Sequence, residues 1–145
     1  MEAAARAGVP AVVGPGCLDM VNFGPRDTVP AKFVGRLFYQ HNPQVTLMRT
    51  SLEENVQLGR IIAGKLNAST GPVHVMLPLK GISVISAAGQ PFFLPEADAA
   101  LFETLKAELR RDIPVQEIDS NINDAVYAES AAKILLRLMA ARTSP

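Results

Sequence analysis

Short apolar runs alternate with longer amphipathic stretches along this chain. The apolar runs are 11–13, 45–48 and 73–77, and 114–118, which includes two polar residues, is predicted as a fourth strand; each is bounded by glycine, proline or polar residues typical of turns. The third run is apolar on both sides apart from His74, as in a strand that is covered by helices on both faces. The pattern predicts four short, buried β-strands.

Helical periodicity appears between these runs. Apolar residues at helical spacing run through 52–66, behind two overlapping capping boxes, Thr50 with Glu53 and Ser51 with Glu54. A second helix is predicted to begin at Pro95, and a third spans 125–142.

Strands alternating with helices favour a parallel sheet with right-handed crossovers. We therefore expect one α/β domain over residues 1–145, a Rossmann-like three-layer fold with a roughly four-stranded parallel sheet and helices on both faces. The segment 17–44 has no clean period and several prolines, which predicts a long irregular connection.

The composition of the chain excludes several classes of function. Lysine and arginine number 14, as do aspartate and glutamate, so the chain lacks the basic field of a nucleic-acid-binding or membrane-surface protein. Cys17 is the one cysteine and there are two histidines, which excludes an internal disulfide and a Cys/His zinc site. No apolar run reaches the roughly 18 residues of a membrane span. These features predict no nucleic-acid or membrane partner, no resident metal and a cytoplasmic location.

Polar and glycine residues follow all four predicted strands, where open α/β sheets bind ligands. Arg49, ahead of a helix N-terminus, suits an anion, although a surface arginine beside a helix cap is the simpler alternative. Lys80 before Gly81 could face a phosphate or could simply be solvated. The predicted anion-binding set is Gly14, Gly16, Asn22, Arg49, Thr50, Lys80, Gly81 and Ser83.

Three titratable residues are candidates for proton transfer: Asp19, His41 and Asp119. Asp19 could equally stabilise its own turn, Asp119 could cap the last helix, and His41 precedes its strand and would point away from the other two. Neither Gly-x-x-x-x-Gly-Lys-Ser/Thr nor Gly-x-Gly-x-x-Gly occurs, so the common nucleotide-binding loops are absent from the sequence.

Four segments carry a family resemblance: 14–24 (GPGCLDMVNFG), 41–50 (HNPQVTLMRT), 77–81 (LPLKG) and 95–102 (PEADAALF). With them the chain resembles a largely uncharacterised bacterial family that is related to the ATP-binding amino-terminal region of a plant protein conferring resistance to tomato mosaic virus. The resemblance implies ATP binding, with magnesium, and a preceding α/β module to which this chain is the carboxyl-terminal module. One departure is Leu94, where the family usually has Asp as a helix cap.

Three functions remain open on this basis. The first is a binding module that forms one wall of a cleft for a nucleotide or another phosphorylated or anionic metabolite. The second is the half-site of an enzyme acting on a small anionic substrate. The third is an interaction module, a homo-oligomer in which the apolar segment 17–44 forms the contact.

Overall fold

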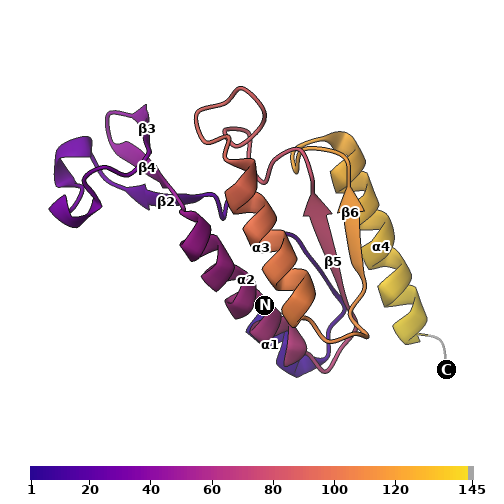
Figure 1. Cartoon of the computed structure of the whole chain (residues 1–145). Helices are drawn as coiled ribbons and strands as arrows, with labels where there is room; N and C mark the ends of the chain where they lie inside the picture. The colour runs from indigo at the N-terminus through magenta and orange to yellow at the C-terminus, as the bar shows by residue number, and fades with distance from the viewer. Residues whose placement is uncertain (144–145) are drawn as a thin grey trace.

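The computed structural model describes residues 1–143 (Figure 1). Helices and strands alternate along much of the chain, and two 3-10 turns, Arg26–Thr28 and Ala31–Phe33, interrupt the segment between the second and third strands. In chain order the elements are α1 (Glu2–Ala7), β1 (Ala11–Val13), β2 (Met20–Phe23), β3 (Phe38–Asn42), β4 (Val45–Arg49), α2 (Leu52–Asn67), β5 (Val73–Pro78), α3 (Pro95–Glu108), β6 (Val115–Ile118) and α4 (Ala125–Thr143).

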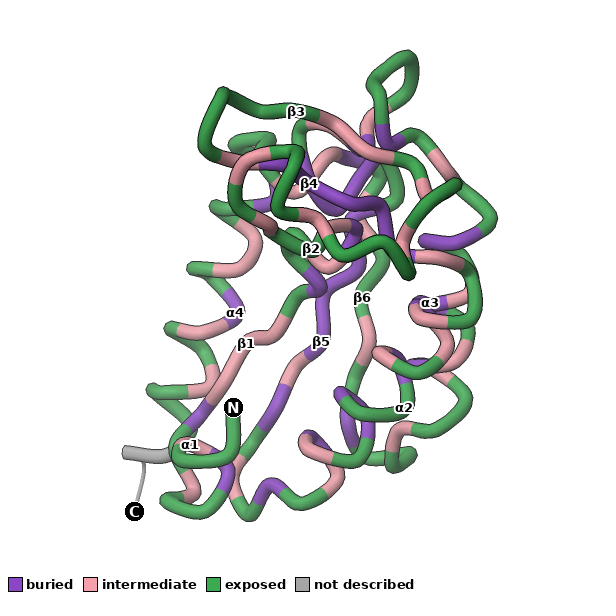
Figure 2. Tube along the Cα trace, turned by 90° about the vertical axis from the view of Figure 1, so that its left-hand side faces the viewer, coloured by how far each residue is buried: buried purple, intermediate pink, exposed green. Residues whose placement is uncertain are grey.

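The core is built on a parallel sheet with strand order β1-β5-β6. Val75 and Leu77 of β5 pack with residues of α2 and α3 on one face, whereas Met76 packs with Tyr127 and Ile134 of α4 on the other. Figure 2 shows this arrangement, with α4 on the left of the parallel strands and α2 and α3 on the right. The expected α/β class with a parallel sheet is confirmed.

The second predicted strand does not join that sheet. β4 instead lies between β2 and β3 in an antiparallel sheet, so the parallel sheet has three strands in the described chain and the prediction of four is wrong. The connection 42–45 explains the difference: the Gln44 amide donates to Asn42 Oδ1 (2.9 Å), an Asx turn that reverses the chain into a β3–β4 hairpin. The segment 17–44 is therefore partly β-structure and not an irregular connection.

The helices begin where the local sequence pattern predicts them. α2 begins at Leu52, and of the two possible capping boxes the structure forms that of Ser51 with Glu54. Arg36 also pairs with Glu54 (2.5 Å), which joins the antiparallel sheet's loop to the start of α2. None of the helices described for residues 1–143 combines the length and the apolar character that a membrane crossing requires.

The N-terminus of α3 lacks a side-chain cap. Leu94 is its N-cap and supplies no side-chain hydrogen bond to the first turn. Leu94→Asp is expected to stabilise the domain by about 1 kcal/mol, because a carboxylate can accept from a free amide there. Urea denaturation at an unchanged m-value measures this. Leu94→Asn, a neutral cap, separates capping from charge; an unchanged or lower midpoint in both variants would contradict the prediction.

Candidate functional site

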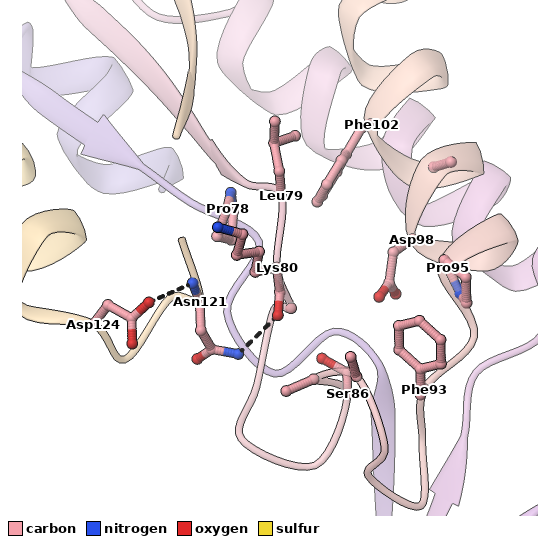
Figure 3. A pocket seen from close by; sticks show the side chains of 14 residues that line it. Pro78, Leu79, Lys80, Ser86, Phe93, Pro95, Asp98, Phe102, Asn121 and Asp124 are labelled. Carbon is pink, nitrogen blue, oxygen red and sulfur yellow. Dashed lines mark hydrogen bonds between the residues drawn. The ribbon is translucent and has the colours of Figure 1, made fainter. Parts of the chain in front are cut away.

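A pocket of about 600 Å³ opens at the carboxyl ends of β5 and β6, where the first turn of α3 and the loop before α4 meet. Figure 3 shows that Phe93, Asp98 and Phe102 lie on the α3 side, whereas Lys80 and Asn121 lie across from them. The volume suits a small metabolite. This edge of the parallel sheet is the one that the sequence predicts for a ligand.

Lys80 and Gly81 line the pocket shortly after the end of β5. The Lys80 ammonium pairs with Asp119 (2.8 Å), and the lysine side chain remains 60% exposed. Gly81 has φ +127°, and a Cβ there would lie 2.6 Å from the Asn121 amide nitrogen, so a side chain does not fit. Asn121 in turn donates to the carbonyls of Lys80 (3.3 Å) and Ser83 (2.8 Å), which holds the two loops of the pocket together.

Arg49 is buried behind the pocket and is not exposed to it as a free cation. Its side chain is 1% exposed and forms an ion pair with Asp98 (2.6 Å). Burial raises the pKa of Asp98, and the Arg49 guanidinium opposes that shift. The other acceptors of the Arg49 guanidinium are Phe92 O (2.9 Å), Thr50 Oγ1 (3.1 Å), Leu94 O (3.3 Å) and Asp19 O (3.5 Å). Arg49 therefore joins the antiparallel sheet to the start of α3 and positions Asp98, whereas Thr50 accepts from Arg49 and donates to Leu18 O.

Asp19 lies in a buried hydroxyl network next to the pocket. Ser83 Oγ donates to Asp19 Oδ2 (2.6 Å), and the Ser86 amide donates to Ser83 Oγ (3.1 Å). Asp19 is fully buried, which raises the pKa of its carboxyl group. Ser86 lines the pocket, whereas neither Asp19 nor Ser83 does. The network thus holds the loop after β5 in place from behind.

The other residues that the sequence predicts for ligand binding or proton transfer lie outside this pocket. Gly14 and Gly16 border two apolar hollows beside β1, of about 410 and 220 Å³. Asn22 on β2 and His41 on β3 are exposed on the antiparallel sheet. The three proposed proton-transfer residues therefore do not share a pocket: Asp19 is buried, His41 is on β3, and Asp119 is exposed and paired with Lys80.

Several residues of the pocket escaped the predicted set, and Asp98 is the most informative of them. Asp98 shares one face of α3 with Leu101, Phe102 and Leu105, and a charge on an apolar helical stripe was a visible signal of a special environment. The aromatic side chains of Phe93 and Phe102 carried no such signal. Only the folded chain brings Phe93, Asp98 and Lys80 to one pocket.

The sequence of this chain is similar to the sequences of known proteins. Residues 1–139 match the family described as "Uncharacterised protein family (UPF0261) C-terminal domain". A UPF0261 protein of Clostridium tetani is 48% identical over 140 residues, which are 96% of this chain and 35% of that protein. A UPF0261 protein of Rhizobium meliloti is 46% identical over 131 residues, 89% of this chain and 33% of that protein.

A plant protein is also similar. The ToMV resistance protein Tm-1(GCR237) of Solanum lycopersicum is 40% identical over 132 residues, which are 90% of this chain and 18% of that protein. The chain therefore spans about a third of the length of the two bacterial relatives and less of the plant protein. These matches confirm the suspected family relationship.

Proposed function

This chain belongs to the UPF0261 family, as its C-terminal domain, and from that premise we propose that it binds a small anionic metabolite, such as a nucleotide or another phosphorylated compound, in the pocket beside Lys80. The observation that carries the proposal is the position of Lys80, the one basic residue that lines a pocket of metabolite size at the carboxyl edge of the parallel sheet. The domain forms one wall of the binding cleft.

The charges around the pocket are compatible with one anionic group. The exposed Lys80–Asp119 pair contributes little to stability, so the ammonium can turn to a ligand at small cost. The amino ends of α3 and α4 are next to the pocket and favour negative charge. Asp98 and Asp124 also line it, which limits the negative charge that it can accept.

A magnesium–triphosphate group does not fit these residues. Magnesium that is bound together with a nucleotide needs only one or two carboxylates, so the balance of charge in the pocket decides. Lys80 is the one lysine or arginine among the lining residues, beside two carboxylates. We therefore assign a singly phosphorylated or carboxylated ligand to this pocket, and propose that the ATP contacts implied by the resemblance belong to the preceding module.

The partner proposals follow from the size of the relatives. Since the chain spans about a third of the bacterial relatives, we propose that their preceding α/β module supplies the second wall of the cleft. We propose also that this module completes the three-stranded parallel sheet as part of a Rossmann-like three-layer unit. Homo-oligomer formation and a cytoplasmic location stay predictions.

Lys80→Met tests the binding proposal in a thermal-shift assay. The probes are AMP, ribose 5-phosphate, inorganic phosphate and magnesium–ATP. A ligand at a hundredfold excess over its Kd stabilises the native state by about 2.7 kcal/mol, or roughly 5–10 °C in a domain of this size. We expect a singly phosphorylated probe to give such a shift with the wild type and to lose most of it with Lys80→Met.

Lys133→Met is the matched control, because Lys133 is also an exposed lysine paired with a carboxylate, Glu129, on the outer part of α4. It is expected to keep the full ligand-induced shift. Equal shifts in all three proteins would place binding elsewhere, and no shift with any probe in the wild type would contradict the proposal.

A further inference from the structure

Asp98 has one carboxylate oxygen engaged and one unengaged. Oδ1 accepts from Arg49 Nη2 (2.6 Å), whereas Oδ2 accepts no hydrogen bond from the residues between 1 and 143. The residue is 8% exposed, and its carboxylate points from α3 into the pocket in Figure 3. One acceptor oxygen of a largely buried side chain is thus left available at the pocket surface.

Arg49 determines which atom of residue 98 faces the pocket. A guanidinium only donates hydrogen bonds, so the atom of residue 98 against it must be an acceptor. Arg49 itself is held by further bonds to the carbonyls of Phe92 (2.9 Å) and Leu94 (3.3 Å). The carboxylate therefore presents its second oxygen to the pocket in a fixed orientation.

The surroundings of this oxygen are largely apolar. Phe93, Pro95, Ala99 and Phe102 line the same side of the pocket. An acceptor among such side chains is stabilised by a ligand that donates a hydrogen bond, and it disfavours a ligand that presents another acceptor. Lys80 lies across the pocket from this group, at the position proposed for the anion.

Resting on the proposed function, we propose that the ligand is bipolar: it carries an anionic group for Lys80 and, on an apolar or aromatic body at its other end, a hydrogen-bond donor that Asp98 recognises. Asp98 is thus the residue that determines specificity in this pocket. It selects amino-bearing ligands over analogues that carry an acceptor oxygen at the same place.

The test uses probe pairs that differ at one group. AMP and 6-methoxypurine riboside 5′-monophosphate carry an amino donor and an ether acceptor at the same ring carbon, and 4-aminobenzoate and 4-methoxybenzoate form a corresponding pair without nucleotide character. Titration calorimetry with the wild-type chain is expected to give at least tenfold tighter binding of the amino member in one pair. The pair that binds tells whether the body is a nucleotide base or a smaller ring.

Asp98→Asn is expected to reverse the preference. Arg49 still requires an acceptor, so the amide oxygen turns toward it and the amide NH₂ faces the pocket. The methoxy-bearing member should then bind at least as tightly as its amino counterpart. Asp112→Asn removes the same charge from an exposed residue paired with Arg110 and is expected to keep the wild-type order.

The outcomes that overturn the inference are distinguishable from failure of the proposed function. Equal affinities of the wild type for both members, with binding still lost in Lys80→Met, refute the role of Asp98 alone. The same holds if folded Asp98→Asn keeps the wild-type order. No binding of any probe refutes both proposals. If circular dichroism shows Asp98→Asn to be unfolded, the wild-type ratio decides, and a ratio below threefold overturns the inference.

Discussion

Replacing Arg49 with methionine is expected to lower the free energy of unfolding by about 3–5 kcal/mol, because it removes one partner of a buried ion pair. The free energy of unfolding falls by more than the contribution of the ion pair alone. The carbonyls of Phe92 and Leu94 lose their guanidinium donor, and Asp98 is left in a buried site without a counter-charge. Urea denaturation at pH 7 measures the change.

The same variant has a defined pH dependence. Burial already raises the pKa of Asp98 above its ordinary value of 3.8, and removing Arg49 removes the group that opposes this shift. An acid with a raised pKa stabilises the fold fully below its unfolded pKa and loses that contribution as pH rises toward the folded pKa. The deficit of Arg49→Met relative to wild type should therefore be smaller at pH 4 than at pH 7.

A double variant separates the two charges. Arg49→Met with Asp98→Asn removes both members of the pair, and is expected to be more stable than Arg49→Met alone by roughly 1 kcal/mol or more at pH 7. A deficit that does not depend on pH, together with no recovery in the double variant, would show that Arg49 acts through packing and not through its pairing with Asp98.

Phe92→Ala is expected to cost about 3–5 kcal/mol, the range for deleting a buried aromatic ring. Phe92 is fully buried, and its ring meets Tyr39 of β3 edge-on with centroids 6.3 Å apart. Its amide donates to Ile85 O (2.8 Å) and its carbonyl accepts from Arg49, so it fastens the loop before α3 to the antiparallel sheet.

Phe93→Ala is the control for this prediction, because the same atoms are deleted one residue along the chain. Phe93 is 48% exposed, so its loss should cost less than about 1 kcal/mol. The two urea midpoints give the comparison directly. Similar midpoints for both variants would mean that Phe92 does not anchor this loop as the structure indicates.

The helices and the strand β5 could be predicted from the sequence because their signals are local. A capping box, a proline at the first helical position and an apolar stripe act over one or two turns. The partners of β4 could not be predicted in this way. An apolar run specifies a buried strand, but its neighbours depend on the hairpin that residues 42–45 form and on chain that lies twenty or more residues earlier.

The sequence predicts the edge of the parallel sheet at which the candidate pocket lies, but not most of the residues that line the pocket. Lys80 and Gly81 follow β5 and so lie at the expected edge of the sheet. Arg49 looked suited to an anion because it precedes a helix N-terminus, but acceptors from distant parts of the chain, at residues 19, 92, 94 and 98, surround it in the fold. Asp98 acquires its position in the pocket through that same burial.

The measurement that tests the central claim most directly is amide chemical-shift mapping of the wild-type chain by ¹H–¹⁵N NMR during titration with AMP and with inorganic phosphate. If the pocket binds an anionic metabolite, the largest perturbations should cluster on the amides of Lys80, Gly81, Ser86 and Asn121, which line it. Perturbations centred on Gly14 and Gly16 beside β1, or none at all at millimolar concentrations of either probe, would contradict the assignment of binding to this pocket.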